Sequence, residues 1–385
     1  MKKLAIVTTH PIQYNAPWFQ LLEAVGKVKP KVFYTWSQLE YEPKHDPGFG
    51  REIQWDIPLL EGYQYCFVKN ISTQPGSHHR KGIINPTLNE EIEQWQADAV
   101  LVFGWNFISH LKCIKYFHKK IPVLFRGDST LLRKQSFLQS FAKNIYLKWV
   151  YHFVDYALYV GTENKKYFIK HGMKESQLIF APHAVDNHFF FDTDRAFEDE
   201  ASQWRLQLGI KAEELVILFA GKFEPIKNLF WLVKFAERFA GMPVKFLLVG
   251  NGTMEQSLKS VAESNHSIIF LGFQNQKKMP IVYRLAQLFM LCSVSETWGL
   301  GVNEAMACER AVLVSDTCGC ANDLVSESNG IIFNTARTDQ LFNKIRNKIS
   351  DQSEWEEMGL NSGKLIQKYS FNNIVTAVEN LLLEK

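Results

Sequence analysis

The sequence predicts an α/β protein with two doubly wound domains, each a parallel sheet covered by helices on both faces. Short apolar runs alternate with longer amphipathic stretches along the chain, and this alternation restarts after an acidic segment at residues 191–203. Strands that alternate with helices form parallel sheets. At 385 residues the chain is also too long for one ordinary hydrophobic core.

The domain boundaries follow from this alternation. We expect a first domain over residues 1–190, a linker at 191–203, a second domain over 204–366, and a last helix within 367–385 that packs back on the first domain. Doubly wound sheets bind ligands beyond the carboxyl ends of their strands, where the strand order reverses. With two such domains, we expect the functional site in a central cleft that both domains face.

Apolar runs predict the strands, and amphipathic stretches predict the helices. In the first half we expect strands at 4–8, 31–34, 99–103, 123–125, 156–160 and 178–180, and helices at 17–25, 107–119 and 131–154. Residues 38–88 are rich in aromatic, polar, Pro and Gly residues, which indicates loops with short strands. In the second half we expect strands at 216–220, 244–249, 268–271, 288–292, 311–315 and 331–333, and helices at 229–239, 254–263, 279–286, 303–309 and 371–383.

The composition is that of an ordinary globular chain, with 46% hydrophobic and 22% charged residues and a net charge of +3. That charge is too small to indicate a nucleic-acid partner, which needs a concentrated basic face. The apolar run after Lys3 is too short for a signal peptide, and no segment reaches the ~20 apolar residues that span a bilayer. We therefore expect a cytoplasmic protein. Of the six cysteines only Cys318 and Cys320 lie close together, so we expect free thiols and no metal site.

The most informative segment is residues 295–306, Ser-Glu-Thr-Trp-Gly-Leu-Gly-Val-Asn-Glu-Ala-Met, which follows an apolar run and leads into a helix-forming one. The backbone N–H groups of such a loop and helix start bind anions such as phosphates. Glu296 and Glu304 lie eight residues apart with two glycines between them, and carboxylates accept hydrogen bonds from hydroxyls. A site for phosphate together with a polyol is typical of a nucleotide sugar.

A basic loop follows the strand predicted at 216–220. Lys222 and Lys227 flank a Gly/Pro turn there, directly after Gly221. Two cations at the carboxyl end of a strand can hold a diphosphate and stabilise its charge as a leaving group. The loop is neither a Walker loop nor a GxGxxG fingerprint. By itself, this pattern of residues is explained most simply as a solvated surface loop.

Two further glycine turns end predicted strands, at 249–252 and at 270–273. A tight connection between any two elements would explain the turn around Gly250. The backbone before Phe273 can hydrogen-bond the edge of a base, and a simple strand-terminating turn explains it equally well.

Taken together, residues 216–333 resemble the donor-binding domain of the retaining GT-B glycosyltransferases of family 4, also called glycosyl transferases group 1. The similarities follow the chain in order: 221–228 is similar to the family's Gly-Arg-x4-Lys-Gly, 249–252 to Val-Gly-Asp/Asn-Gly, 270–272 to Phe-Leu-Gly, 283–286 to Tyr-x-x-Ala, and 296–304 to Glu-x7-Glu. Residues 181–190 resemble its hinge segment Pro-Asn-Gly-Val-Asp-x3-Phe, with His-Ala in place of Asn-Gly.

The resemblance implies a GT-B fold with two Rossmann-like domains, the first on the acceptor side and the second binding the donor. It implies that Lys222 and Lys227 bind the donor diphosphate, that Glu296 takes hydroxyls of the donor sugar and that Glu304 takes the ribose hydroxyls. The implied donor-binding set is completed by Gly221, Gly250, Phe273, Gly299, Leu300 and Gly301, of which the last three offer backbone N–H groups to sugar and phosphate.

Two first-half residues join Glu296 as catalytic candidates. His10 follows the first strand, where many family members have a glycine pair, and we expect it to face the cleft; capping or packing is the alternative. Arg126 stands where the family often has a His that contacts the transferred sugar. Arg126 would bind the sugar, a phosphate or an anionic acceptor, and an ion pair with Asp128 is the alternative.

A stretch at 131–156 mixes basic and aromatic residues, among them Arg133, Lys143 and Trp149. A basic amphipathic helix can lie on an anionic membrane, which would bring the protein to the inner face of the membrane as a peripheral protein. A helix with one core face and one solvated face explains the same pattern, and we favour it.

We therefore expect a glycosyltransferase of the hexosyltransferase type. It would move a sugar from a nucleotide-diphosphate sugar to an acceptor hydroxyl with retention of anomeric configuration, in glycan or glycoconjugate biosynthesis. The resemblance implies a metal-independent reaction without a cofactor. The acceptor stays open between a glycan, a lipid-linked and a small-molecule compound. The alternative is a catalytically inactive nucleotide-sugar-binding protein, which the departure at Arg126 favours.

Overall fold

The computed structural model describes residues 1–36, 56–133 and 136–384, and the backbone of 44–46 and 51–53. The prediction of loops and short strands at 38–88 therefore lies partly outside the described residues. The chain divides into two compact units. Unit 1 consists of Met1–Glu42, Pro58–His183 and Phe371–Lys385, and unit 2 of Pro43–Ile57 and Ala184–Ser370.

Unit 1 is built on a parallel seven-stranded sheet with the order β5-β2-β1-β6-β7-β8-β9. The strand order reverses between β1 and β6, which is the switch point of this sheet. The central residues of β1, Leu4 to Val7, are fully buried, as expected for a strand covered on both faces. The strands are β1 (Lys2–Thr8), β2 (Val28–Tyr34), β5 (Gln64–Phe67), β6 (Ala99–Phe103), β7 (Val123–Arg126), β8 (Tyr156–Tyr159) and β9 (Leu178–Phe180).

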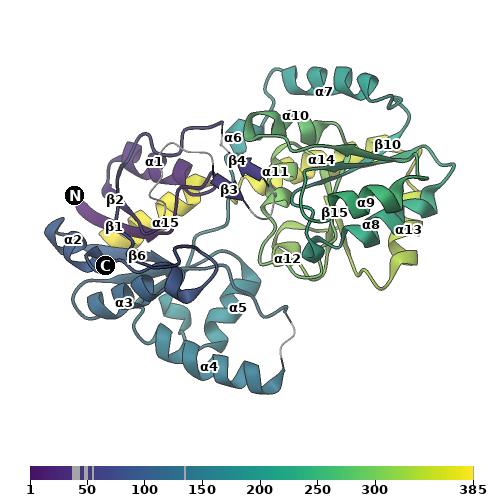
Figure 1. The fold of residues 1–385 in the computed structure, drawn as a ribbon. Coiled ribbons are helices and arrows are strands. Elements are labelled where there is room, and N and C mark those ends of the chain that lie inside the picture. The colour runs from purple at the N-terminus through teal and green to yellow at the C-terminus, as the bar shows by residue number, and fades with distance from the viewer. Residues whose placement is uncertain (37–43, 47–50, 54–55, 134–135, 385) are drawn as a thin grey trace. The chain divides into compact units, whose positions relative to one another are not determined.

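Helices cover both faces of this sheet (Figure 1). On one face α1 (Ala16–Val25) packs beside the C-terminal helix α15 (Phe371–Leu383), which also contacts β9. The predicted return of the last helix to the first domain is thereby confirmed. The core on the other face is formed by α2 (Leu88–Gln94), α3 (Ile108–Phe117), α4 (Phe137–Tyr151) and α5 (Thr162–Lys170).

Unit 2 contains a parallel six-stranded sheet with the order β12-β11-β10-β13-β14-β15. Its strand order reverses between β10 and β13. The strands are β10 (Leu215–Ala220), β11 (Val244–Val249), β12 (Ile268–Leu271), β13 (Leu288–Leu291), β14 (Ala311–Ser315) and β15 (Gly330–Phe333). The unit also includes the antiparallel pair β3 (Lys44–Asp46) and β4 (Arg51–Ile53).

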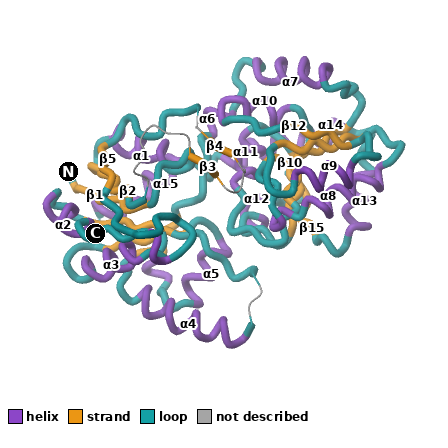
Figure 2. Tube along the Cα trace, in the orientation of Figure 1, coloured by secondary structure: helices purple, strands orange, loops and turns teal. Residues whose placement is uncertain are grey.

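The helices of unit 2 lie on both faces of its sheet (Figures 1 and 2). On one face lie α8 (Leu229–Ala236), α9 (Glu255–Ala262) and α13 (Thr338–Arg346). On the other lie α10 (Met279–Arg284), α11 (Leu300–Ala307) and α14 (Gln352–Ile366), with α7 (Ala196–Gln207) against α10. The short helices are α6 (Asn187–Phe190) and α12 (Ala321–Leu324).

The chain leaves unit 1 between His183 and Ala184, before the segment that we expected to be a linker. Residues 191–203 belong to unit 2, and α7 begins within them. The acidic residues that suggested a solvated linker have a structural use: Glu198 lies 3.5 Å from Arg284 Nε and 3.1 Å from Arg310 NH2. The Arg284 side chain is almost fully buried. A buried guanidinium needs acidic partners, so the ion pairs hold this segment against α10.

Candidate functional site

The switch point of unit 2 brings together the two loops on which the sequence analysis concentrated. Lys227, in a 3-10 turn after β10, forms an ion pair with Glu296, in the loop after β13, between Nζ and Oε2. Both side chains are about one-fifth exposed, at 21% and 18%. The loops are also joined through the backbone, because Val294 N–H donates to the Ile226 carbonyl at 3.0 Å. The acid and the base thus occupy the position in the sheet where doubly wound folds bind ligands.

The Glu296 loop is anchored on its other side as well. Glu296 N–H donates to the Thr317 carbonyl at 3.3 Å, and Gly319 N–H donates to the Glu296 carbonyl at 3.0 Å. The hydroxyl of Ser293 lies 3.4 Å from Glu296 Oε2. The carboxylate is therefore held by its neighbours while it remains partly open to solvent.

Two glycines shape the start of α11. Gly299 has φ of +104°, a backbone conformation that favours glycine, and a Cβ there would lie 2.6 Å from the Leu291 side chain. At Gly301 a Cβ would lie 3.1 Å from the Phe289 ring. Leu300 is the first residue of the helix. The first N–H groups of a helix have no acceptor within it and carry a partial positive charge, which suits a phosphate.

Glu304 lies in the second turn of α11 and is 4% exposed. The hydroxyl of Tyr283, on α10, donates to Glu304 Oε2 at 2.6 Å. The sequence analysis quoted Tyr283 only as part of a family pattern and gave it no role. The sequence did contain a signal for Tyr283, because the Tyr-x-x-Ala pattern at 283–286 puts a tyrosine on the helix before β13.

The remaining donor-site candidates lie at the same edge of the sheet. Gly221 N–H donates to the Val249 carbonyl at 3.0 Å, and a Cβ on Gly250 would lie 2.0 Å from the Gly221 carbonyl oxygen. The turns after β10 and β11 therefore touch through bare backbone. Lys222 follows β10 and Phe273 follows β12, and both are half-buried. Because all these strands are parallel, the loops that carry the predicted donor site gather at their carboxyl ends.

In unit 1, Arg126 ends β7 and is 4% exposed. Its guanidinium donates to the carbonyls of Ala181 and Pro182 at 2.8 and 2.9 Å. Burial lowers the pKa of Arg126 to about 10, and nearby Asp128 partly opposes the shift. Through these two hydrogen bonds, Arg126 holds the end of β7 against the segment after β9. The Asp128 carboxylate lies 3.8 Å from His183 Nε2.

His10 follows β1 and is half-buried. Its Nδ1 lies 2.9 Å from the Thr9 hydroxyl, and its ring meets the edge of Trp36 at 5.1 Å between centroids. The strands that carry His10 and Arg126 are separated by β6.

The sequence analysis missed a buried histidine at the switch point of unit 1. His110, on α3, is fully buried; its Nε2 lies 2.9 Å from the Thr35 hydroxyl and its Nδ1 2.8 Å from the Phe103 carbonyl oxygen. Burial lowers the pKa of His110 to about 4. It joins the chain after β2 to the end of β6. The only signal in the sequence is a polar residue among the apolar ones of the α3 pattern.

The described residues include no group of three or more His, Cys, Asp or Glu side chains placed to hold a metal ion. An Asp-x-Asp sequence occurs at 192–194, where Asp192 Oδ2 lies 3.6 Å from the buried Arg284 Nε. All six cysteines are free thiols, as expected. In the described part of the chain, every helix falls short of the length and apolar character that a membrane span requires.

Comparison with known families shows what the second unit resembles. Residues 200–365 match the model of the family glycosyl transferases group 1. The match lies within unit 2 and covers less than half of the chain, and we call these residues the group 1 domain after the family that they resemble. The group 1 domain contains the ion pair of Lys227 and Glu296 and all the donor-site candidates.

The relatives of the group 1 domain are distant. An uncharacterised glycosyltransferase of Methanocaldococcus jannaschii is 28% identical over 203 residues, 51% of each chain. A D-inositol 3-phosphate glycosyltransferase of Mycobacteroides abscessus is 31% identical over 143 residues, 35% of this chain and 32% of that one. The aligned region thus spans about a third to a half of the length of these curated relatives.

Solved structures are similar to this chain in fold over its whole length. The Anabaena protein HepE, solved with UDP and glucose, has a TM-score of 0.71 at 16% identity over 99% of each chain. A glycosyltransferase of Rickettsia africae has a TM-score of 0.74 at 13% identity, over 100% of this chain and 99% of that one. The predicted fold class is confirmed: two Rossmann-like parallel-sheet domains of the GT-B type.

Proposed function

We propose that this chain is a glycosyltransferase that moves a sugar from a nucleotide-diphosphate sugar to an acceptor hydroxyl. The observation that carries the proposal is the ion pair of Lys227 and Glu296 at the switch point of a group 1 domain. It places a cation for phosphate and an acceptor for sugar hydroxyls side by side. The glycine-lined start of α11 follows Glu296 in the same loop.

The diphosphate is assigned to the basic side of this site. Lys222 and Lys227 come from the loop after β10, and the N–H groups at the start of α11 add a fixed partial positive charge. As the bond from the anomeric carbon to the diphosphate breaks, negative charge grows on the leaving phosphate. Donors that are already in place stabilise that charge without reorganisation. We propose that these groups serve in place of a divalent cation.

The hydroxyls are assigned to the two glutamates. Glu296 is partly open to solvent and takes hydroxyls of the transferred sugar. Glu304 is buried, and Tyr283 fixes one of its oxygens. A carboxylate has about four lone-pair sites, so Glu304 can still accept from the ribose hydroxyls of the nucleotide. The transfer proceeds with retention at the anomeric carbon, and the acceptor belongs to glycan or glycoconjugate synthesis.

His10 stays a candidate for contact with the transferred sugar. Arg126 is better described as a positioning residue, because its guanidinium binds the two carbonyls that follow β9. In that role it sets the shape of the loop after β7 without touching substrate.

Donor binding is the first experiment. HepE was solved with UDP and glucose, so UDP-glucose leads a panel of UDP-, GDP- and ADP-sugars tested by thermal shift. A ligand that binds only the folded state stabilises the protein and so raises Tm. At a hundredfold excess over Kd, the added free energy of unfolding is about 2.7 kcal/mol. Lys227→Gln and Glu304→Gln should lose the shift given by the best donor.

The matched control is Lys245→Gln. Lys245 lies in the same unit, is 23% exposed and pairs with Glu214 at 3.7 Å, so it resembles Lys227 in its exposure and in having a carboxylate partner. We expect Lys245→Gln to keep the donor shift. A full shift in Lys227→Gln would remove the basis of the assignment.

Turnover separates an enzyme from an inactive binding protein. With the donor that binds, release of UDP or another nucleoside diphosphate in the presence of acceptor sugars should depend on Glu296, and Glu296→Gln should abolish it. Proton NMR of the product reports the anomeric configuration, and excess EDTA tests the independence from metal. Donor binding without hydrolysis or transfer to any acceptor would favour the binding protein.

A further inference from the structure

The outer face of α4 carries a row of exposed apolar side chains. Phe137 and Leu138 are 82% and 78% exposed, Phe141 and Ile145 are 57% each, and Trp149 is 42%. At 100° a residue, these five positions fall within a sector of about 120° of the helix. We call them the α4 stripe. Soluble proteins rarely leave so continuous an apolar surface open unless it binds something.

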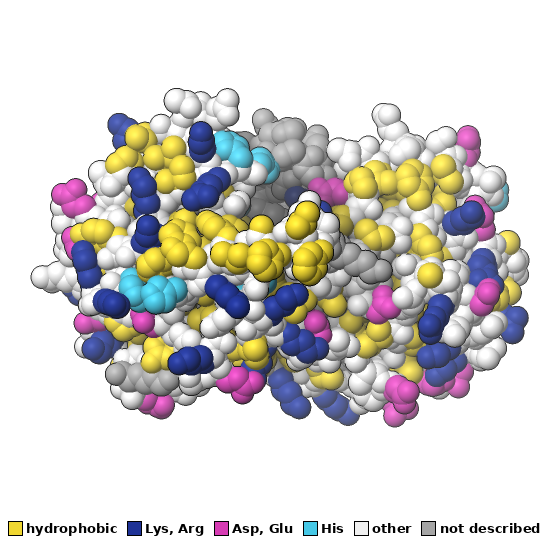
Figure 3. Space-filling model, turned by 90° about the horizontal axis from the view of Figure 1, so that it is seen from below, with side chains coloured by type: hydrophobic (Ala, Val, Ile, Leu, Met, Phe, Trp, Pro, Cys, Tyr) yellow, Lys and Arg dark blue, Asp and Glu magenta, His cyan; other side chains and the backbone are white. Residues whose placement is uncertain are grey.

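The surroundings of the α4 stripe are basic. From Ser129 to Val154 the sequence contains four basic residues and no acidic one. Lys148 lies within the same sector of the helix, and Lys115 of α3 lies 5.2 Å from the centroid of the Trp149 ring. Figure 3 looks at this side of the molecule and shows an apolar band bordered by Lys and Arg side chains.

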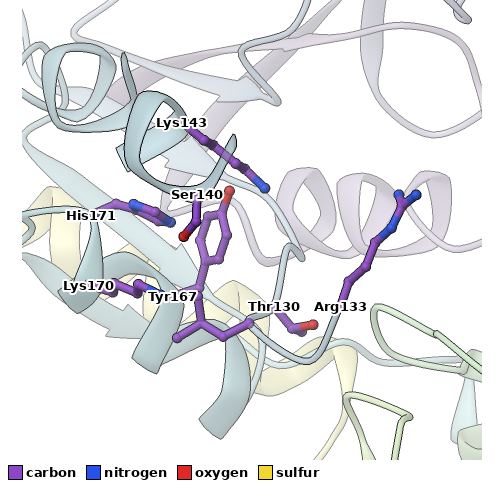
Figure 4. Close-up of a pocket in the computed structure, with 8 residues that line it drawn as sticks. Thr130, Arg133, Ser140, Lys143, Tyr167, Lys170 and His171 are labelled. Atoms are coloured by element: carbon purple, nitrogen blue, oxygen red, sulfur yellow. The ribbon is translucent and has the colours of Figure 1, made fainter. Parts of the chain in front are cut away.

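A cationic pocket adjoins the beginning of α4. Arg133 and Lys143 line it together with Lys170 of α5, and the described lining residues include no Asp or Glu. Figure 4 shows that Arg133 lies on the loop before α4 and that Lys143 lies on α4 itself. Burial lowers the pKa of Lys143, and repulsion by Arg133 and Lys170 lowers it further. Cations gathered without a carboxylate favour an anion, and a phosphate suits this set.

We infer that unit 1 docks on an anionic phospholipid surface through α4. The α4 stripe enters the boundary between headgroups and acyl chains, as apolar faces of interfacial helices do. Lys115 and Lys148, which border the α4 stripe, face the lipid phosphates, and the cations of the pocket, on another side of α4, add a longer-range attraction to the anionic surface. The inference does not depend on the donor site, which lies in the other unit.

A second copy of the chain is the competing occupant of this surface. Self-association through the α4 stripe would bring Lys148 and Lys115 of one copy toward those of the other, and like charges at an interface are unfavourable. An anionic bilayer satisfies both the apolar side chains and the charges. The charge pattern therefore favours a membrane over a second copy of the chain.

The test is co-sedimentation of the full chain with vesicles. We expect binding to phosphatidylcholine vesicles that contain phosphatidylglycerol, weakening as salt is raised, and little binding to phosphatidylcholine alone. The double variant Phe137→Ser/Phe141→Ser should weaken binding roughly tenfold or more, because each exposed ring contributes apolar area to the interface. Lys148→Gln and Lys115→Gln should each weaken it about fivefold.

Leu206→Ser is the matched control, because Leu206 is 74% exposed on α7 of unit 2. It should bind vesicles as the wild type does, and circular dichroism and Tm should show all variants folded. Failure of the wild type to bind anionic vesicles, or unchanged binding by Phe137→Ser/Phe141→Ser, overturns the inference. So does a concentration-dependent dimer, seen by light scattering without lipid, that the same double variant abolishes.

Discussion

The phenolic hydroxyl of Tyr283 donates a 2.6 Å hydrogen bond to the carboxylate of Glu304, and both side chains are buried. A buried carboxylate is costly unless donors satisfy it. The bond comes from α10, one helix before the glycine loop, so the orientation of Glu304 depends on a residue outside the loop. This arrangement explains why the helix before β13 belongs to the site.

Tyr283→Phe tests that dependence. The variant keeps the ring, which packs against Phe289, and removes one donor from Glu304. We expect a loss of about 1–3 kcal/mol in the free energy of unfolding, measured by urea denaturation, and a smaller thermal shift with the donor. Unchanged stability together with an unchanged donor shift would show that Glu304 does not rely on this bond.

Gly250→Ala tests the contact between the turns after β10 and β11. Its new Cβ would lie 2.0 Å from the Gly221 carbonyl oxygen, at a φ of +129°. Backbone cannot yield as a flexible side chain does, so we expect a destabilisation of about 3 kcal/mol or more.

Gly209→Ala separates the effect of close approach from that of φ. Gly209 also has positive φ, +69°, but nothing lies within 4 Å of the added Cβ. It should cost only about 1 kcal/mol. Equal losses in the two variants, measured by thermal denaturation, would contradict the close contact.

Arg126→Met distinguishes a structural from a catalytic arginine. The substitution leaves the carbonyls of Ala181 and Pro182 without their charged donor, and hydrogen bonds to charged groups contribute about 1.5–3 kcal/mol each. We expect unit 1 to lose several kcal/mol of stability, whereas the exposed Arg80→Met should change little. If Arg126→Met kept full stability and lost kcat, the arginine would instead act on the substrate.

The buried His110 predicts a pH dependence of stability. Its pKa is about 4 in the folded protein, against an ordinary value of about 6.5 in the unfolded chain. Between these values the unfolded chain binds a proton that the folded protein does not, so the free energy of unfolding falls as pH is lowered from about 6.5 to about 4. The full loss is on the order of 3 kcal/mol.

His110→Gln provides the comparison, since the amide does not titrate. Urea unfolding at several pH values should give a shallower dependence for the variant, and the difference isolates His110 from the other histidines. Parallel curves for the two proteins would contradict the shifted pKa.

The strands were predictable because buried parallel strands are continuous apolar runs. The strand expected at 216–220 begins one residue earlier in the structure, and those at 244–249 and 268–271 have the same bounds. Their order follows from the doubly wound pattern, and that order puts the loop of Lys227 beside the loop of Glu296. The proximity of these two loops could therefore be predicted from the sequence.

The polar contacts were not predictable, because they join residues far apart in the chain. Nothing near Arg126 indicates that its partners are the carbonyls of Ala181 and Pro182. The acids of residues 191–203 look solvated until Arg284 and Arg310 fold against Glu198. Which buried polar group meets which partner is set by tertiary packing, and a local pattern does not contain it.

The C-terminal helix α15 belongs to unit 1, although the whole of residues 184–370 precedes it in unit 2. On the ribosome, the second sheet has therefore emerged while the first still exposes the apolar surface of α1 that α15 covers. A fragment that ends at His183 would keep that surface open and be prone to aggregate. An expression clone of the first unit must join the segment that ends at His183 to the helix of residues 371–383 through a designed connection.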